Sequence, residues 1–139
     1  LTNTNAQYVG RVPADDIIDV LIDDLSNSQV PESGENIVHF NNQTGTAHTL
    51  VAGDIGKLGT MTNVATNILT VPPNSSVGFT IGTKINIAQF GSGQTTISPG
   101  SGVTINSADS ANKIRVIYST ASLIKTGINI WLLAGDITI

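Results

Sequence analysis

The sequence offers few side chains that could perform acid–base catalysis. It contains ten acidic residues, six lysines and arginines, and two histidines. Asp19 and Asp23 stand four residues apart and would share one face of a helix. General acid–base catalysis needs a carboxyl group whose pKa is shifted by burial or by a partner. Since these carboxylates belong to a run of acidic residues, a solvated helix face is the favoured interpretation.

Metal binding and nucleophilic catalysis find little support either. His39 and His48 lie on neighbouring predicted strands, and a zinc site would need further ligands, yet the chain has no other His and no Cys. Counting alone leaves a Ser–His–Asp triad open, but no Gly-x-Ser-x-Gly elbow occurs. The loop-like stretch Gly91–Thr96 lacks the Gly-Lys-Ser/Thr ending of a phosphate-binding loop. We therefore expect structural histidines, no metal, no cofactor and no enzymatic activity.

Amide and hydroxyl side chains at predicted turns are the better candidates for ligand binding. They can exchange hydrogen bonds with sugar hydroxyl groups without bringing charge into the contact. Loops on a rigid scaffold are also where binding groups concentrate. The simpler interpretation of each residue is a turn position chosen for its backbone conformation. The main candidates are Asn41, Asn42, Gln43, Asn74, Ser75, Asp109 and Asn112, with Asn63, Asn67, Ser76 and Ser110 as further members.

Composition narrows the class of protein. Charged residues make up 12% of the 139 residues, about half the usual share. A surface rich in hydroxyl and amide groups is common in extracellular fibres, sandwiches and sheet-rich virion proteins. The formal net charge of −4, with scattered cations, argues against nonspecific binding of nucleic acid. No stretch approaches the roughly 20 apolar residues of a membrane-spanning helix, so we expect no membrane insertion.

Residues 1–35 are expected to form an acidic attachment segment and linker. Pro13, Asp15 and Asp16 suit the first turn of a helix, and Ser26–Gly34 reads as a linker. A helix of about ten residues is not stable alone in water, so its apolar stripe must contact another surface. The predicted attachment or oligomer-interface residues on this stripe are Ile17, Ile18, Leu21, Ile22 and Leu25.

Residues 36–139 read as short strands separated by Gly, Pro and Asn turns. Strands at intervals of roughly 8–12 residues are typical of a sandwich or barrel. We expect a mainly β domain, an antiparallel β-sandwich or barrel of jelly-roll-like form. A weak repeat around Thr95–Gly100 and Gly102–Ile105 has too few copies for a solenoid. The expected strands are Ile37–Phe40, Thr46–Val51, Lys57–Thr62, Ile68–Val71, Val77–Ile81, Lys84–Phe90, Gln94–Ile97, Val103–Asn106, Lys113–Tyr118, Ala121–Lys125, Ile128–Leu133 and Ile137–Ile139.

Trp131 is the largest apolar side chain of the predicted strands. Between Ile130 and Leu132, it is expected to pack in the core or at a subunit contact. Stacking of its indole ring on a sugar is the alternative. We count Trp131 among the predicted oligomer-interface residues.

A series of short motifs follows in order from Thr49 to Asp136. The motifs are Thr49–Leu58, Leu69–Asn74, Phe79, Ile81–Ile85, Gln89–Ile97, Gly102–Ser107, Ala121–Lys125 and Trp131–Asp136. Together they resemble a C-terminal β-rich module of tail-fibre and appendage proteins of tailed bacteriophages, also found in some virion surface proteins. The resemblance implies a trimeric β-domain located in the virion. Residues 1–40 take no part in it.

The resemblance favours a tail-fibre or receptor-binding tip domain that recognises the host surface. The partners expected for such a domain are two further copies of itself, other proteins of the tail appendage, and a glycan or protein of the host surface. The alternative is a capsid decoration (cement) protein, whose acidic segment docks on the major capsid protein and stabilises the head. A polysaccharide-degrading enzyme is the weakest class, because Asp54, Asp109 and Asp136 are the only acids in residues 41–139.

Overall fold

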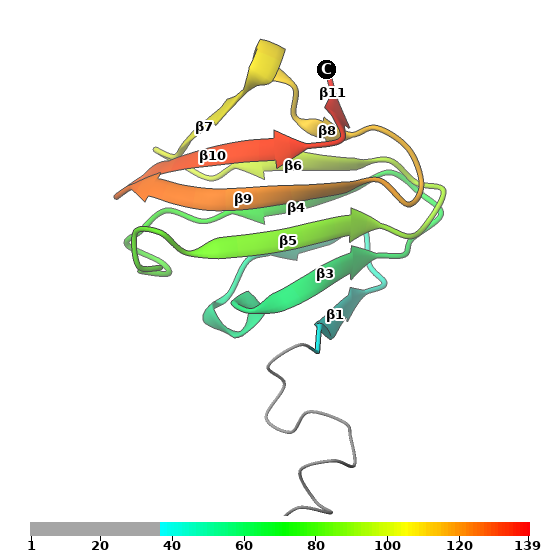
Figure 1. The fold of residues 1–139 in the computed structure, drawn as a ribbon, viewed down its shortest axis with the longest axis horizontal. Coiled ribbons are helices and arrows are strands. Elements are labelled where there is room, and N and C mark those ends of the chain that lie inside the picture. The colour runs from blue at the N-terminus through cyan, green and yellow to red at the C-terminus, as the bar shows by residue number, and fades with distance from the viewer. Residues whose placement is uncertain (1–36) are drawn as a thin grey trace, which may run out of the picture. The chain divides into compact units, whose positions relative to one another are not determined.

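The computed structural model describes residues 37–139, which form eleven strands and two single 3₁₀ turns, η1 and η2 (Figure 1). The predicted acidic helix and its stripe, Ile17, Ile18, Leu21, Ile22 and Leu25, lie outside the described residues. In chain order the elements are β1 His39–Gln43, β2 Ala47–Thr49, η1 Ala52–Asp54, β3 Lys57–Met61, β4 Asn67–Val71, β5 Lys84–Gln89, β6 Thr95–Pro99, β7 Thr104–Ser107, η2 Ala108–Ser110, β8 Lys113–Ile114, β9 Thr120–Gly127, β10 Ile130–Gly135 and β11 Ile137–Thr138.

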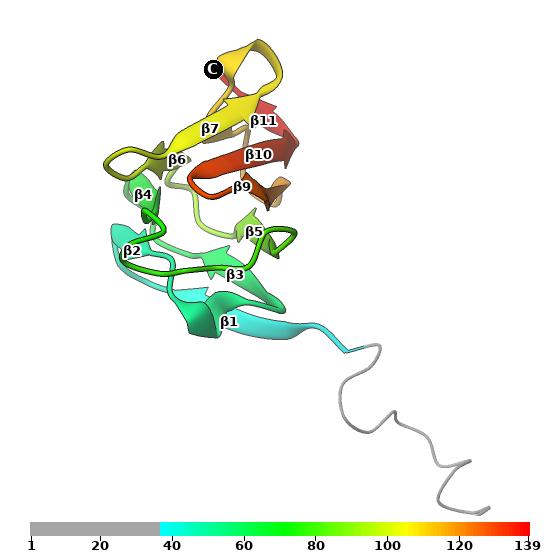
Figure 2. The ribbon, with the colours of Figure 1, turned by 90° about the vertical axis from the view of Figure 1, so that its left-hand side faces the viewer.

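The strands form two sheets packed face to face, which confirms a mainly β, two-layered domain (Figure 2). One sheet has the order β1-β3-β5-β9-β10-β7 and the other the order β11-β8-β6-β4-β2. Both sheets are mixed. Five strand pairs are parallel and four are antiparallel. The expected antiparallel, jelly-roll-like arrangement is therefore wrong.

The chain path explains four of the five parallel pairs. From β1 to β8 successive strands alternate between the two sheets, and up to β6 the strands two apart in the sequence become neighbours and run in the same direction. The fifth parallel pair joins β7 to β10. A parallel pair normally needs a long crossover connection, and here a strand of the opposite sheet supplies it. Among the described elements, only β9 and β10 follow each other within one sheet, as an antiparallel hairpin closed by Ile128 and Asn129.

The core fills the space between the two sheets. Along β10, Trp131 and Leu133 are buried while Ile130 and Leu132 are exposed, as the alternation of a half-buried strand requires. Trp131 is 1% exposed. Its ring meets that of Phe79 edge-on, with centroids 5.5 Å apart and planes at 85°. The indole ring thus belongs to the core of a single chain.

Two expected strands are wrong in whole or in part. Val77–Ile81 forms no strand and is irregular, with the amide of Phe79 donating to the carbonyl of Val77. The strand expected over Lys113–Tyr118 ends at Ile114 as β8. In both stretches the apolar residues satisfy the strand pattern, but their backbone amides bond within turns or to other loops.

A buried network of polar side chains links strands β4, β5 and β6. The Asn67 amide group donates to the carbonyls of Ala65 and Gly93, at 3.0 and 3.3 Å, and its Oδ1 accepts from Thr95 Oγ1 at 2.6 Å. Gln89 Oε1 accepts from the Thr95 amide at 3.1 Å. Asn67 is therefore buried scaffold, although the sequence placed it among the ligand candidates.

Candidate binding surface

No group of three or more potential metal ligands occurs among residues 37–139. His39 is exposed on β1, while His48 on β2 contacts Asp54. No helical segment within that range has the length and apolar character needed to cross a membrane.

Asp54 is the centre of a polar cluster that joins β1, β2 and η1. Its buried carboxylate lies 2.9 Å from His48 Nε2, accepts a 2.8 Å bond from the Val51 amide and also accepts from Asn41 Nδ2. Gln43 Nε2 donates to Asn41 Oδ1 at 2.8 Å. Several hydrogen bonds to a buried carboxylate offset the cost of removing its charge from water. The cluster therefore links the edge strands β1 and β2, which belong to different sheets.

The candidates Asn41, Asn42 and Gln43 lie on strand β1 and not in a loop. Asn42 Oδ1 accepts from Thr60 Oγ1 of the neighbouring strand β3 at 3.2 Å. With the amides of Asn41 and Gln43 bound to each other and to Asp54, most of the polar atoms of this group serve the scaffold.

Asn74 also has a scaffold role. Its Oδ1 accepts a 2.6 Å bond from Nζ of Lys125, and its main-chain amide donates to Asn129 Oδ1 at 2.8 Å. Lys125 is 2% exposed, and its ammonium group makes a second bond to the Phe79 carbonyl, at 2.8 Å. No carboxylate pairs with it in the part of the chain that the structure describes. Ser75, beside Asn74, is exposed.

Asp109 and Asn112 belong to a third location, around η2. Asp109 is exposed and Asn112 is half-buried. Asp109 borders the same hollow as Gly135 at the end of β10, whereas Asn74 lies beside the turn that precedes β10. The candidate ligand residues thus fall into three separate places, and the structure does not bring them together at one end of the domain.

The clearest exposed feature was missed by the sequence analysis. Phe90, Val116, Ile117 and Tyr118, here called the aromatic cluster, are all exposed, with Tyr118 at 72%. The rings of Phe90 and Tyr118 meet edge-on with centroids 5.8 Å apart. Contiguous exposed apolar side chains of this kind mark interaction sites in soluble proteins, and tyrosine is enriched where binding energy concentrates.

Tyr118 is held in an unusual backbone conformation. Its φ of 70° lies in the left-handed region, which bulky residues rarely adopt and which persists only where surrounding contacts impose it. The contacts here are hydrogen bonds from the Tyr118 amide to the Gln89 carbonyl at 2.6 Å and from the Ser119 amide to the Val116 carbonyl at 3.0 Å. The phenol ring is therefore presented to solvent by a fixed turn.

An ion pair fixes the turn to the end of β10. Arg115 donates from Nε and Nη2 to the two carboxylate oxygens of Asp136, at 2.6 and 2.8 Å. Ser119 Oγ donates to Asp136 Oδ2 at 2.6 Å. Bidentate pairing of this kind sets orientation as well as adding attraction. Asp136 thereby holds residues on both sides of Val116–Tyr118.

Titration of Asp136 tests this arrangement. The hydrogen bonds from Arg115 and Ser119 lower the pKa of the Asp136 carboxyl group from 3.8 to about 2. Because the pKa is depressed in the folded state, the stabilisation is complete above pH 3.8 and is lost as the pH falls towards 2. In an NMR titration of the side-chain carboxyl carbon we expect a midpoint near 2 in the native protein and an upward shift towards 3.8 in Arg115→Gln. An unshifted midpoint in that variant would contradict the pairing.

One sequence signal could have revealed the cluster. Val116, Ile117 and Tyr118 are three consecutive apolar residues, and a strand with one solvated face cannot bury all three.

In comparisons with known proteins, no family model matches the chain and no curated protein is detectably similar to it.

Proposed function

We propose that the chain is a structural protein of a bacteriophage virion, a homotrimeric tail-fibre or receptor-binding tip domain that recognises the host surface without catalysis. The observation that carries the proposal is the aromatic cluster, an exposed apolar patch on a fixed turn at one end of a two-sheet scaffold. The sequence resemblance to phage tail modules supplies the virion context.

The cluster suits non-covalent recognition at a cell surface. Aromatic rings provide large contact areas with few rotatable bonds, and a fixed turn loses little conformational freedom on binding. Host-surface glycan or protein could pack on the Tyr118 ring while neighbouring polar turn residues complete the hydrogen bonds. Trp131 is too deeply buried to stack on a sugar. In this proposal Tyr118 therefore takes the sugar-stacking role that the sequence suggested as an alternative for Trp131.

The outer face of the six-stranded sheet supports the trimer. Leu58, Ile124 and Leu132 share this face by strand register, and Lys84 is the one charged residue among their register partners. A face of a sheet with so little charge is suited to burial against other copies of the chain.

A cement protein is the second candidate, and strand β1 favours it. Val38 and Phe40 are exposed at this edge of the six-stranded sheet. A strand at a sheet edge is a template for pairing with another chain, and these two exposed apolar side chains would add contact area for a protein docked on a capsid lattice.

Adsorption of the purified trimer separates the two candidates. We expect binding to bacterial cells or to a glycan array, and a loss of roughly 30-fold in affinity in Tyr118→Asn, which corresponds to about 2 kcal/mol for a central contact. Asparagine removes the ring but tolerates the left-handed backbone. Ile128→Ala truncates an exposed apolar side chain at the other end of β9 and should bind normally. Native affinity in Tyr118→Asn would refute the cluster as the binding site. Absence of cell and glycan binding, together with tight binding to undecorated heads, would favour the cement protein.

A further inference from the structure

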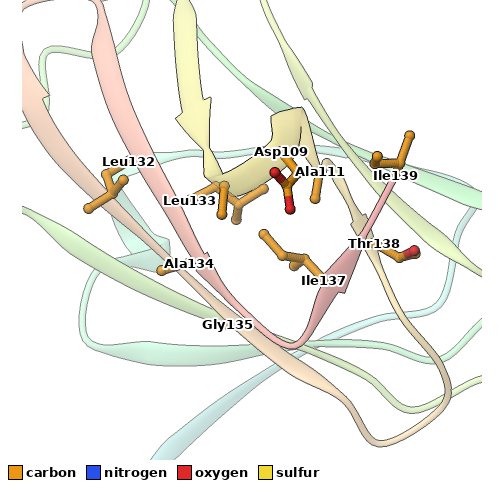
Figure 3. A pocket seen from close by; sticks show the side chains of 10 residues that line it. Asp109, Ala111, Leu132, Leu133, Ala134, Gly135, Ile137, Thr138 and Ile139 are labelled. Atoms are coloured by element: carbon orange, nitrogen blue, oxygen red, sulfur yellow. The ribbon is translucent and has the colours of Figure 1, made fainter.

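A hollow beside η2 combines apolar walls with one carboxylate. It has a volume of about 480 Å³ and lies between η2, the end of β10 and β11. Leu133, Ile137 and Ala111 supply apolar walls, and Asp109 is the one lining residue with a charged side chain. The Asp109 carboxylate points into the space between Leu133 and Ile137 (Figure 3).

This carboxylate makes no hydrogen bond or ion pair within residues 37–139. The two ion pairs found there involve Asp54 and Asp136, so no lysine or arginine of the described chain neutralises Asp109. An unpaired negative charge beside apolar walls is complementary to a group that carries a positive charge on an aliphatic stem.

The backbone provides an independent indication of a binding site. Asp109 and the next residue, Ser110, both have left-handed conformations, with φ of 56° and 57°. Two successive non-glycine residues in this region are disfavoured, and such positions concentrate at sites that hold ligands. The turn is imposed by the bond from the Ala111 amide to the Ala108 carbonyl, at 3.0 Å, and by the bond from the Asn112 amide to the Thr138 carbonyl, at 3.1 Å. These two bonds hold the backbone of the turn that carries Asp109.

We propose that this hollow receives a lysine side chain of a partner protein. The aliphatic stem packs against Leu133 and Ile137, and the ammonium group binds the Asp109 carboxylate. The hollow shares no lining residue with the aromatic cluster, so a partner bound there would leave the Tyr118 ring accessible.

Titration of the full chain with a lysine mimic tests the proposal. The probe is Nα-acetyl-lysine N-methylamide, and the uncharged comparison is the norleucine compound, which has the same stem without the ammonium group. In ¹H–¹⁵N NMR spectra we expect the lysine mimic to shift the amide signals of Ala108–Ala111 and Gly135–Ile137. The norleucine compound should bind roughly three- to fivefold more weakly, since the difference is one exposed ion pair.

Two variants separate charge from backbone geometry. Asp109→Asn keeps the shape and tolerates the left-handed conformation, so it should lower the affinity for the lysine mimic to that of the norleucine compound. Ser110→Gly relaxes the turn but retains the carboxylate, and should bind the lysine mimic. Equal affinity of the two compounds for the native chain, native affinity in Asp109→Asn, or no shift at these amides would each overturn the proposal. None of these outcomes bears on binding at Tyr118.

Discussion

Replacing Trp131 with alanine will lower the free energy of unfolding by about 3–5 kcal/mol, the range for deletion of a large buried aromatic side chain. The ring is fully enclosed between the sheets, and its edge-on contact with Phe79 holds the irregular segment Val77–Ile81 against the core. Removing it therefore leaves a cavity and frees that segment. Urea denaturation followed by far-ultraviolet circular dichroism measures the change. Fluorescence would not serve, because Trp131 is the single tryptophan.

The neighbouring residue provides the control. Leu132 points to the outer face of the same strand and is exposed in the single chain, so Leu132→Ala should cost less than about 1 kcal/mol at concentrations where the chain is monomeric. A cost for Leu132→Ala that grows with protein concentration would indicate a subunit contact on the outer face. Equal costs for the two variants in the monomer would contradict the placement of Trp131 in the core.

The β character could be predicted from the sequence because it is a local property. Alternation in Lys84–Gln89 and Ile130–Gly135, with Gly and Pro between strands, follows directly from the two faces of a strand. Strand direction is not local. A turn of a few residues looks the same whether it closes a hairpin or carries the chain to the opposite sheet, so the parallel pairing of β3 with β5 could not be inferred.

Inner-face polar residues were equally hard to foresee. Gln89 and Lys125 occupy buried positions of the alternating pattern, where a single sequence suggests solvent exposure. Gln89 Nε2 donates to the nearby Gly91 carbonyl, but the partners of Lys125 are the Phe79 carbonyl and Asn74 Oδ1, 46 and 51 residues earlier in the chain. Only the assembled fold brings these acceptors to the side chains.

The candidate site was missed for a related reason. The apolar run Val116–Tyr118 resembles strand, and its exposure depends on the left-handed Tyr118 and on Asp136, 18 residues later in the chain. Conversely, Asn41, Gln43 and Asn74 have the composition of ligand-binding turns, but their amides hydrogen-bond within the scaffold. Asparagine and glutamine side chains can bind a ligand or stabilise the scaffold, and their hydrogen-bond partners in the fold decide between these two roles.

Glycine at position 93 is expected to be indispensable, because two turns of the chain pass in direct backbone contact there. A Cβ atom added to Gly93 would overlap the carbonyl group of Ala65. Neither backbone can move away easily, since the Gly93 amide donates to the Asn63 carbonyl at 3.1 Å and Asn67 Nδ2 donates to the Gly93 carbonyl at 3.3 Å. Gly93→Ala should therefore cost about 3 kcal/mol or more, as severe overpacking does.

Gly53 offers a matched comparison on the same chain. A Cβ atom there would meet no heavy atom within 4 Å, so Gly53→Ala should change the free energy of unfolding by less than about 0.5 kcal/mol. Urea denaturation of both variants, followed by circular dichroism, measures the difference. If Gly93→Ala proved as harmless as Gly53→Ala, the two turns could not approach as closely as described. The buried network of Asn67, Thr95 and Gln89, which depends on that approach, would then have to be arranged differently.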